Sequence, residues 1–238
     1  MTSNDNMLAI IQPYFYPYIG YFQLIQAANK IIFYDDVSYV KKGWINRNKI
    51  LINGSDFTFT IPLKSASQNK VINDIVPMID SGYKRKFLAQ IKSAYQKAPY
   101  YQYVIDLLQD VIDRQYDNIS EMAISSILSV FDYLGKEINW SRSSVCSPTT
   151  KGMERSDRLI QITKDQGYQK YVNPIGGQTL YNKEYFINSG VELYFVNSKE
   201  FRYKQFDNEF VPHLSIIDVL MFNNKTFVKE LFDTYCLV

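Results

Sequence analysis

Two short apolar runs near the N-terminus, joined by a proline-containing loop and an apolar helix, constrain the fold more than any other feature. The first run, Met7 to Gln12, is typical of a buried strand. Two prolines then prevent a regular helix. The segment Tyr21 to Asn29 is apolar on most sides, as in a buried helix, and Ile31 to Tyr34 gives the second strand. Strand, loop, helix and strand in this order predict a right-handed parallel crossover.

The rest of the chain alternates strands and helices around a block of helices. An Asn-Gly turn at 53–54, between the apolar runs 49–52 and 57–62, predicts a hairpin. Helices are expected at 82–97, 100–115, 119–134, 157–166, 184–189, 215–222 and 226–235, and strands at 137–140, 170–172 and 191–196. We predict a single α/β domain over residues 1–238. Its mixed sheet is built from both ends of the chain, with a Rossmann-like N-terminal unit and a helical insertion at about 82–135.

Composition excludes several functional classes. The net charge of +2, with cations and acids interspersed, argues against nucleic-acid binding. One histidine cannot build a His-rich zinc site, and Cys146 and Cys236 form neither a disulfide framework nor a metal cluster. Residues 1–6 are polar, unlike a signal peptide, and no apolar run is long enough to span a membrane. We therefore expect a cytoplasmic protein with no metal site. Its 20 tyrosines suit pockets for sugars or nucleotides.

Polar and aromatic side chains fill the loop after the first predicted strand. Ligands of α/β proteins bind at the carboxyl ends of strands, and free N–H groups at a helix N-terminus favour anions. The loop residues assigned to substrate binding are Gln12, Tyr14, Tyr18, Gly20 and Tyr21. The alternative is a rigid, proline-braced turn whose tyrosines pack in the core.

Two adjacent acids end the second predicted strand. Asp35 and Asp36 are candidate catalytic bases, because a carboxylate at a strand end can accept a hydrogen bond from a hydroxyl or take a proton from an amine. Adjacent side chains on a strand point apart, so we expect one of the two to face a pocket. A solvated turn with an Asx cap is the structural alternative.

The segment 41–47 combines cations, an indole and an amide. Lys41, Lys42 and Arg47 are candidates for holding phosphate, Arg47 in a bidentate manner. Trp44 is a candidate for stacking on a base or a sugar, and Asn46 for donating to an oxyanion. A basic surface loop with Trp44 as a core plug has the same sequence pattern.

Further candidates lie in the second half of the chain. The sole histidine, His213, is a candidate general base, since imidazole ordinarily titrates near neutrality; a surface histidine beside a helix is the alternative. Ser215 and Asp218 have the spacing of a capping box, and Asp218 is an alternative pocket residue. Gly176 and Gly177 come after a predicted strand as a candidate anion nest. These last four residues are assigned to substrate binding.

Five stretches resemble the WbqC-like protein family: QPYFYPYIGYFQLI, YDDVSYVKKGWINRNKI, SDRLI at 156–160, the glycine loop near 176 and LSIID at 214–218. The resemblance extends from about residue 7 to about residue 223, and its first two motifs are long and specific. It implies a gene set for O-antigen or another bacterial surface polysaccharide. It also implies transfer of glycine or a related acyl group to a nucleotide-linked amino sugar in the cytoplasm.

A fainter similarity concerns the fold. The N-terminal unit resembles that of nucleotidylyltransferases of the HIGH-motif superfamily, in which a His-x-Gly-His loop holds nucleotide phosphates. Here Tyr18 and Tyr21 stand at the two histidine positions. Tyrosine cannot supply the same cationic partner, so adenylyl transfer of that kind is disfavoured, while the nucleotide-binding geometry can persist.

Three hypotheses result. In the leading one, a base deprotonates the sugar ammonium, and the amine attacks a thioester on coenzyme A or on an acyl or peptidyl carrier protein. This N-acyl or aminoacyl transferase needs no intrinsic cofactor. The alternatives are a nucleotidyltransferase that uses ATP and magnesium, and a non-catalytic nucleotide-sugar-binding accessory protein. The leading hypothesis predicts that replacing Asp36 or Arg47 by Ala abolishes turnover with little change in melting temperature.

Overall fold

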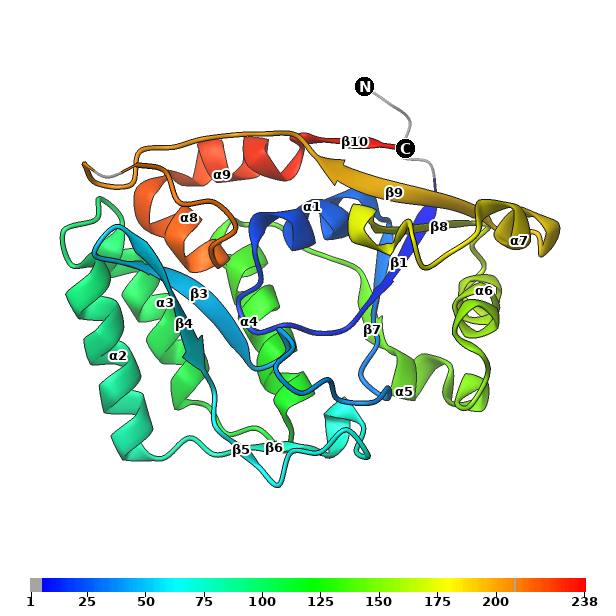
Figure 1. Cartoon of the computed structure of the whole chain (residues 1–238), viewed down its shortest axis with the longest axis horizontal. Helices are drawn as coiled ribbons and strands as arrows, with labels where there is room; N and C mark the ends of the chain where they lie inside the picture. The colour runs from blue at the N-terminus through cyan, green and yellow to red at the C-terminus, as the bar shows by residue number, and fades with distance from the viewer. Residues whose placement is uncertain (1–5, 208) are drawn as a thin grey trace.

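The computed structural model describes residues 6–207 and 209–238 and has an α/β fold built on a six-stranded mixed sheet (Figure 1). Most of the polar segment 1–6 lies outside the described residues. The strand order is β10-β9-β8-β1-β2-β7, and each adjacent pair is parallel except β10 with β9. The strands are β1 (Met7–Ile11), β2 (Lys30–Phe33), β7 (Trp140–Arg142), β8 (Lys170–Pro174), β9 (Glu192–Ser198) and β10 (Tyr235–Leu237). The predicted fold class is confirmed.

The N-terminal crossover has the predicted form. Strands β1 and β2 pair in parallel, with Leu8 opposite Lys30 and Ile11 opposite Phe33, and α1 (Ile19–Ala27) connects them. The helix begins at Ile19, two residues before the predicted start. Pro17, the second proline of the loop, precedes the N-cap residue Tyr18, so it leaves the helical hydrogen bonds intact. All residues of α1 except Gln26 are buried, including the polar Gln23, whose side-chain amide donates to the Leu231 carbonyl at 2.8 Å.

Helices cover both faces of the sheet, as the apolar sequence of β1 requires. Leu8 and Ile10 face a cluster with α6 (Arg155–Asp165) and α7 (Lys183–Asn188). Met7 and Ala9 face the larger core, which contains α1 and α9 (Lys225–Phe232). Figure 1 shows α6 and α7 at one side of the molecule, away from α8 (Ile216–Phe222) and α9.

The predicted helical block is present, with a hairpin packed on it. Helices α2 (Ser81–Tyr95), α3 (Tyr101–Asp113) and α4 (Ile119–Tyr133) end within two residues of the predicted positions. The hairpin joins β3 (Arg47–Ile52) to β4 (Ser55–Thr60) through Asn53 and Gly54, both at positive φ, as its turn requires. Phe59 of the hairpin contacts Phe87 of α2 with ring centroids 5.4 Å apart.

Two predicted elements differ from the structure. The last helix ends at Phe232 rather than at 235, because Tyr235–Leu237 instead pairs with β9 and forms an edge strand of the sheet. The strand expected at 137–140 is β7 at 140–142, where it pairs with β2. Short elements that no prediction covered are β5 (Leu63–Lys64), β6 (Val76–Pro77) and α5 (Ser143–Cys146).

Candidate functional site

A cavity of about 760 Å³ lies at the carboxyl ends of β8 and β9, beside the loop that comes after β1. Strand β1 lies between β2 and β8. The chain therefore continues from β1 toward one edge of the sheet through β2, and the later strands β8 and β9 lie on the other side of β1. Ligands of open α/β sheets bind at such a switch point. The volume lies within the usual range for small-molecule sites. We therefore take this cavity as the candidate functional site.

The first wall consists of the loop after β1 and the start of α1. Tyr14 and Tyr18 line the cavity, and burial raises the pKa of both phenols, so they are neutral hydrogen-bonding groups there. Gly20 lies behind Tyr18, because a Cβ at position 20 would lie 2.5 Å from the ring of Tyr18. Tyr21 is buried and donates to the carbonyl of Gln12 at 2.9 Å. Of the five predicted residues, Gln12, Gly20 and Tyr21 are thus not among the lining residues.

The second wall comes from the loop before β3 and from β3 itself. Trp44 lines the cavity and is 40% exposed. The guanidinium of Arg47 lies over its ring, 5.1 Å from the centroid, and the Nε of Arg47 donates to the Gly43 carbonyl at 3.0 Å. Lys41 and Lys42 are exposed and are not among the lining residues. This wall therefore offers an indole with a cation behind it.

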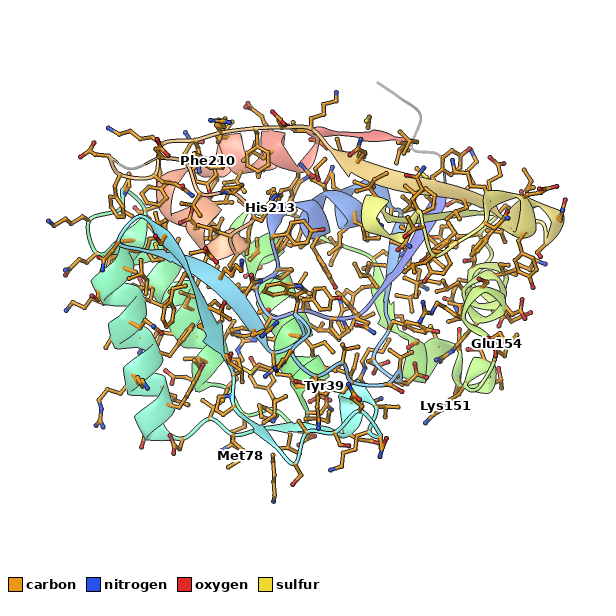
Figure 2. The ribbon with its side chains drawn as sticks, viewed as in Figure 1. Tyr39, Met78, Lys151, Glu154, Phe210 and His213 are labelled. Atoms are coloured by element: carbon orange, nitrogen blue, oxygen red, sulfur yellow. The ribbon has the colours of Figure 1, made fainter. Side chains whose placement is uncertain are left out.

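The third wall comes from the segment between β9 and α8, segment 199–214, of which the structure describes residues 199–207 and 209–214. Its cavity-lining side chains include Lys199, Arg202, Tyr203 and His213. Figure 2 shows Phe210 and His213 on this segment, above the first loop. His213 has a φ of 59°, a left-handed conformation that is uncommon for histidine. Together with Glu200, these residues give the cavity a mixed but mainly cationic wall.

Ser215 and Asp218 lie behind the third wall. Both are buried and neither is a lining residue. Ser215 caps α8 by accepting from the Ile217 N–H at 3.2 Å, and its hydroxyl donates to the Tyr16 carbonyl at 2.6 Å. The carboxylate of Asp218 does not complete a capping box; it accepts hydrogen bonds from other side chains, including the hydroxyl of Tyr203. Burial raises its pKa.

Asp35 and Asp36 lie in a separate buried network at the ends of β2 and β7, and neither lines the cavity. Asp36 accepts from Arg158 at 2.6 Å, and Asp35 accepts from the Ser144 N–H at 3.0 Å. Ser143 donates to both carboxylates. The expected arrangement, with one acid facing a pocket, is not found, because both residues lie beyond the end of β2, where strand alternation no longer applies.

The remaining candidates divide between the cavity and the core. Asn46 is buried, with its amide committed to the Ile61 carbonyl at 2.7 Å and to the hydroxyl of Tyr39 at 2.8 Å. Gly176 lines the cavity in a 3₁₀ turn after β8. Gly177 lies against Asn173, whose side-chain nitrogen would be 2.2 Å from an added Cβ.

Several lining residues escaped the sequence interpretation. Asn48 lines the cavity, and its amide also holds the carbonyl of Tyr16 at 2.7 Å. Lys199, Arg202 and Tyr203 come after β9 in the stretch KEFRY. The signal was present in the sequence, because charged and aromatic residues stand directly after the strand predicted at 191–196.

The family model described as WbqC-like protein family matches residues 12–230, which include all three walls of the cavity. The chain belongs to this family. It is also similar to an uncharacterized protein of Mycobacterium tuberculosis, with 24% identity over 217 residues, covering 90% of this chain and 92% of that protein. No solved structure matches the chain.

Two features are absent from residues 6–207 and 209–238, the part of the chain that the structure describes. None of the helices in this part of the chain is both long and apolar enough to cross a membrane. The same residues contain no group of three or more His, Cys, Asp and Glu side chains placed to hold a metal ion.

Proposed function

We propose that this cavity binds a nucleotide-linked amino sugar, and that the protein transfers an acyl or aminoacyl group, such as glycyl, to the sugar amine. The observation that supports this proposal is the pairing of aromatic and cationic walls at the switch point of the sheet. Trp44 and Tyr18 offer surfaces for a base or a pyranose ring, while Lys199 and Arg202 suit a diphosphate. The proposed setting is O-antigen or surface-polysaccharide biosynthesis in the cytoplasm.

His213 is the proposed general base. It lines the cavity, whereas Asp35, Asp36 and Asn46 do not. In the proposed reaction, imidazole takes one proton from the sugar ammonium, and the amine nitrogen attacks the thioester carbonyl. A carbon–nitrogen bond forms, the carbon–sulfur bond breaks, and the second amine proton leaves with the thiol. Ile19, the first residue of α1, lines the cavity, and its N–H is a candidate for holding negative charge.

The first test is a thermal-shift screen against UDP- and dTDP-linked amino sugars, ATP with magnesium, and coenzyme A. A ligand at a hundred times its Kd adds about 2.7 kcal/mol to the free energy of unfolding, a shift of several degrees. Stabilisation by an amino-sugar nucleotide supports the proposal. Stabilisation by ATP and magnesium alone favours nucleotidyl transfer instead, and no stabilisation by any compound contradicts a nucleotide-sugar site.

A matched pair of variants then localises the site. Arg202 lines the cavity, whereas Lys204, two residues further on, is exposed and pairs with Asp207 at 3.3 Å. Arg202→Ala should weaken binding of the stabilising nucleotide sugar by about tenfold or more, because a charge-assisted hydrogen bond is lost. Lys204→Ala removes the same charge from the same segment and should leave binding unchanged. Equal effects would indicate a general electrostatic contribution rather than a site.

Mass spectrometry of the sugar product after incubation with a glycyl thioester tests the transfer step.

A further inference from the structure

One buried carboxylate connects the third wall of the cavity to the rest of the molecule. Asp218 of α8 is fully buried. One of its oxygens accepts from the hydroxyl of Tyr203 at 2.5 Å and from the amide of Gln205 at 2.7 Å. The other accepts from the hydroxyl of Tyr95 at 2.8 Å. Two of these three partners belong to segment 199–214, so the carboxylate mainly holds the wall.

The wall is closed on itself through the same contacts. The side chain of Gln205 accepts from the Val211 N–H at 2.7 Å and donates to the Val211 carbonyl at 3.1 Å. These two hydrogen bonds hold Val211 against Gln205. Pro212 and His213 follow Val211 directly in the sequence. Asp218 therefore holds the wall at Tyr203 and, through Gln205, the approach to His213.

The partners of Asp218 distinguish this arrangement from an ordinary stabilising contact. The three hydrogen-bond donors are two phenols and one amide, all neutral, so within residues 6–207 and 209–238 no ion pair offsets the cost of burying this carboxylate. An apolar residue of similar size would avoid that cost but could not hold Tyr203 and Gln205. Burial of the acid is thus explained by the geometry of the wall rather than by stability.

We propose that Asp218 is a positioning residue that sets the shape of the cavity by holding segment 199–214 through Tyr203 and Gln205. The carboxylate does not touch the ligand; it places the ring of Tyr203 and the backbone before His213. The proposal concerns the cavity wall itself, so it stands independently of which ligand the cavity binds.

Hydrogen exchange of the ligand-free protein tests the proposal. In Asp218→Ala, amides of segment 199–214 should exchange about tenfold faster or more, because Tyr203 and Gln205 lose their acceptor, while peptides from β1 and β8 keep their protection. In Asp218→Asn, the amide oxygen can still accept from Tyr203 and Gln205, and its nitrogen can donate to Tyr95. We therefore expect the asparagine variant to restore protection of the segment.

Two tyrosine variants provide a matched control. Tyr203→Phe and Tyr95→Phe each remove one hydroxyl from the same carboxylate, but only Tyr203 belongs to the wall. Tyr95 instead connects Asp218 to β3, through the Leu51 N–H at 2.7 Å. Tyr203→Phe should loosen segment 199–214, and Tyr95→Phe should not. If Asp218→Ala does not fold, these two tyrosine variants still test whether Asp218 holds segment 199–214.

The results that overturn the proposal are specific. Equal exchange of segment 199–214 in the two tyrosine variants, or a uniform rise in exchange throughout the molecule, would mean that Asp218 acts only on global stability. Titration with UDP is a separate measurement. If the wild-type protein binds UDP, Asp218→Ala should lower the affinity for UDP, and Asp218→Asn should have an affinity close to that of wild type. If wild type binds no nucleotide, the proposed function fails while the exchange experiment still decides the role of Asp218.

Discussion

His213 has a left-handed backbone conformation, which is uncommon for residues other than glycine, although asparagine, aspartate and histidine adopt it more often than the others. Its φ is 59°, and the chain is anchored two residues later, at Ser215. The Ser215 N–H donates to the Lys49 carbonyl at 2.8 Å, and Ser215 forms a β-bridge with Tyr18. Strain of this kind is frequently found at functional sites. The side chain that bears the strain here is the proposed base.

This strain gives a prediction in which stability and activity change in opposite directions. His213→Gly should raise the free energy of unfolding by about 1 kcal/mol, because glycine adopts positive φ without a steric cost. The same change should abolish acyl transfer. Urea denaturation and a turnover assay measure the two effects. His213→Asn, which tolerates this φ but cannot act as the base, should also be folded and inactive; an active asparagine variant would exclude His213 as the catalyst.

The buried pair of Asp36 and Arg158 leads to a different expectation from the one drawn from sequence. Both side chains are 5% exposed, and Arg158 also lies over the ring of Tyr34 at 4.7 Å. Asp36→Ala leaves a buried guanidinium without its carboxylate, so the free energy of unfolding should fall by about 3–5 kcal/mol. Chemical denaturation measures this loss. Asp36→Leu combined with Arg158→Met should be less harmful than Asp36→Ala alone; a melting temperature unchanged in Asp36→Ala would instead favour a role in the site.

At the scale of elements, the start of α1 is shaped by the packing of Tyr18 on Gly20. A Cβ at position 20 would lie 2.5 Å from the Tyr18 ring and 3.0 Å from the hydroxyl oxygen of Ser198. Gly20→Ala should therefore move the half-exposed Tyr18 ring in the cavity and weaken nucleotide-sugar binding, with a small change in melting temperature. Isothermal titration measures the affinity. Gly176→Ala is the control, because Gly176 also lines the cavity but has no atom within 4 Å of an added Cβ. Equal losses in both variants would contradict this explanation.

Elements whose signals are local were predictable. The hairpin turn at Asn53 and Gly54, the helix α4 with its cap at Asn118, and the β1–α1–β2 crossover are each specified by a few adjacent residues. Strand β10 was not predictable, because its three residues become a strand only by pairing with the edge of β9. Pairing between distant segments leaves little trace in the sequence of either partner.

The site depends on the whole molecule in the same way. Its walls come from residues 14–19, 44–48 and 197–214, which meet only after the sheet has formed. Sequence interpretation found the polar residues of the first two segments, but it could not separate those that line the cavity, such as Tyr18, from those that brace the core, such as Asn46. The sequence also assigned Asp218 to substrate binding. Only the fold shows that Tyr203 lines the cavity and donates to Asp218, which itself does not line the cavity.

The pH dependence of the free energy of unfolding should reflect the burial of Asp218. Burial raises the pKa of this carboxyl, so the folded chain holds the proton at pH values where the unfolded chain has lost it. The contribution of this group to stability is therefore full below the ordinary aspartate pKa and falls as the pH rises through the folded pKa. Asp218→Asn lacks this titration. Its free energy of unfolding relative to wild type should rise from about pH 4 upward, by at most about 1.4 kcal/mol per pH unit.

Asp56 supplies a control of opposite sign. Its hydrogen bond from Lys49 at 2.9 Å lowers its pKa, so its contribution is present above the ordinary aspartate pKa and is lost as the pH falls. Relative to wild type, Asp56→Asn should therefore become less stable as the pH rises to the ordinary aspartate pKa and change little above it, whereas Asp218→Asn becomes more stable above that pH. Urea denaturation of the three proteins between about pH 2.5 and 7 covers both windows and compares the two trends. Parallel trends would mean that Asp218 is not held with a raised pKa, and that the carboxylate behind the cavity wall is solvated rather than enclosed.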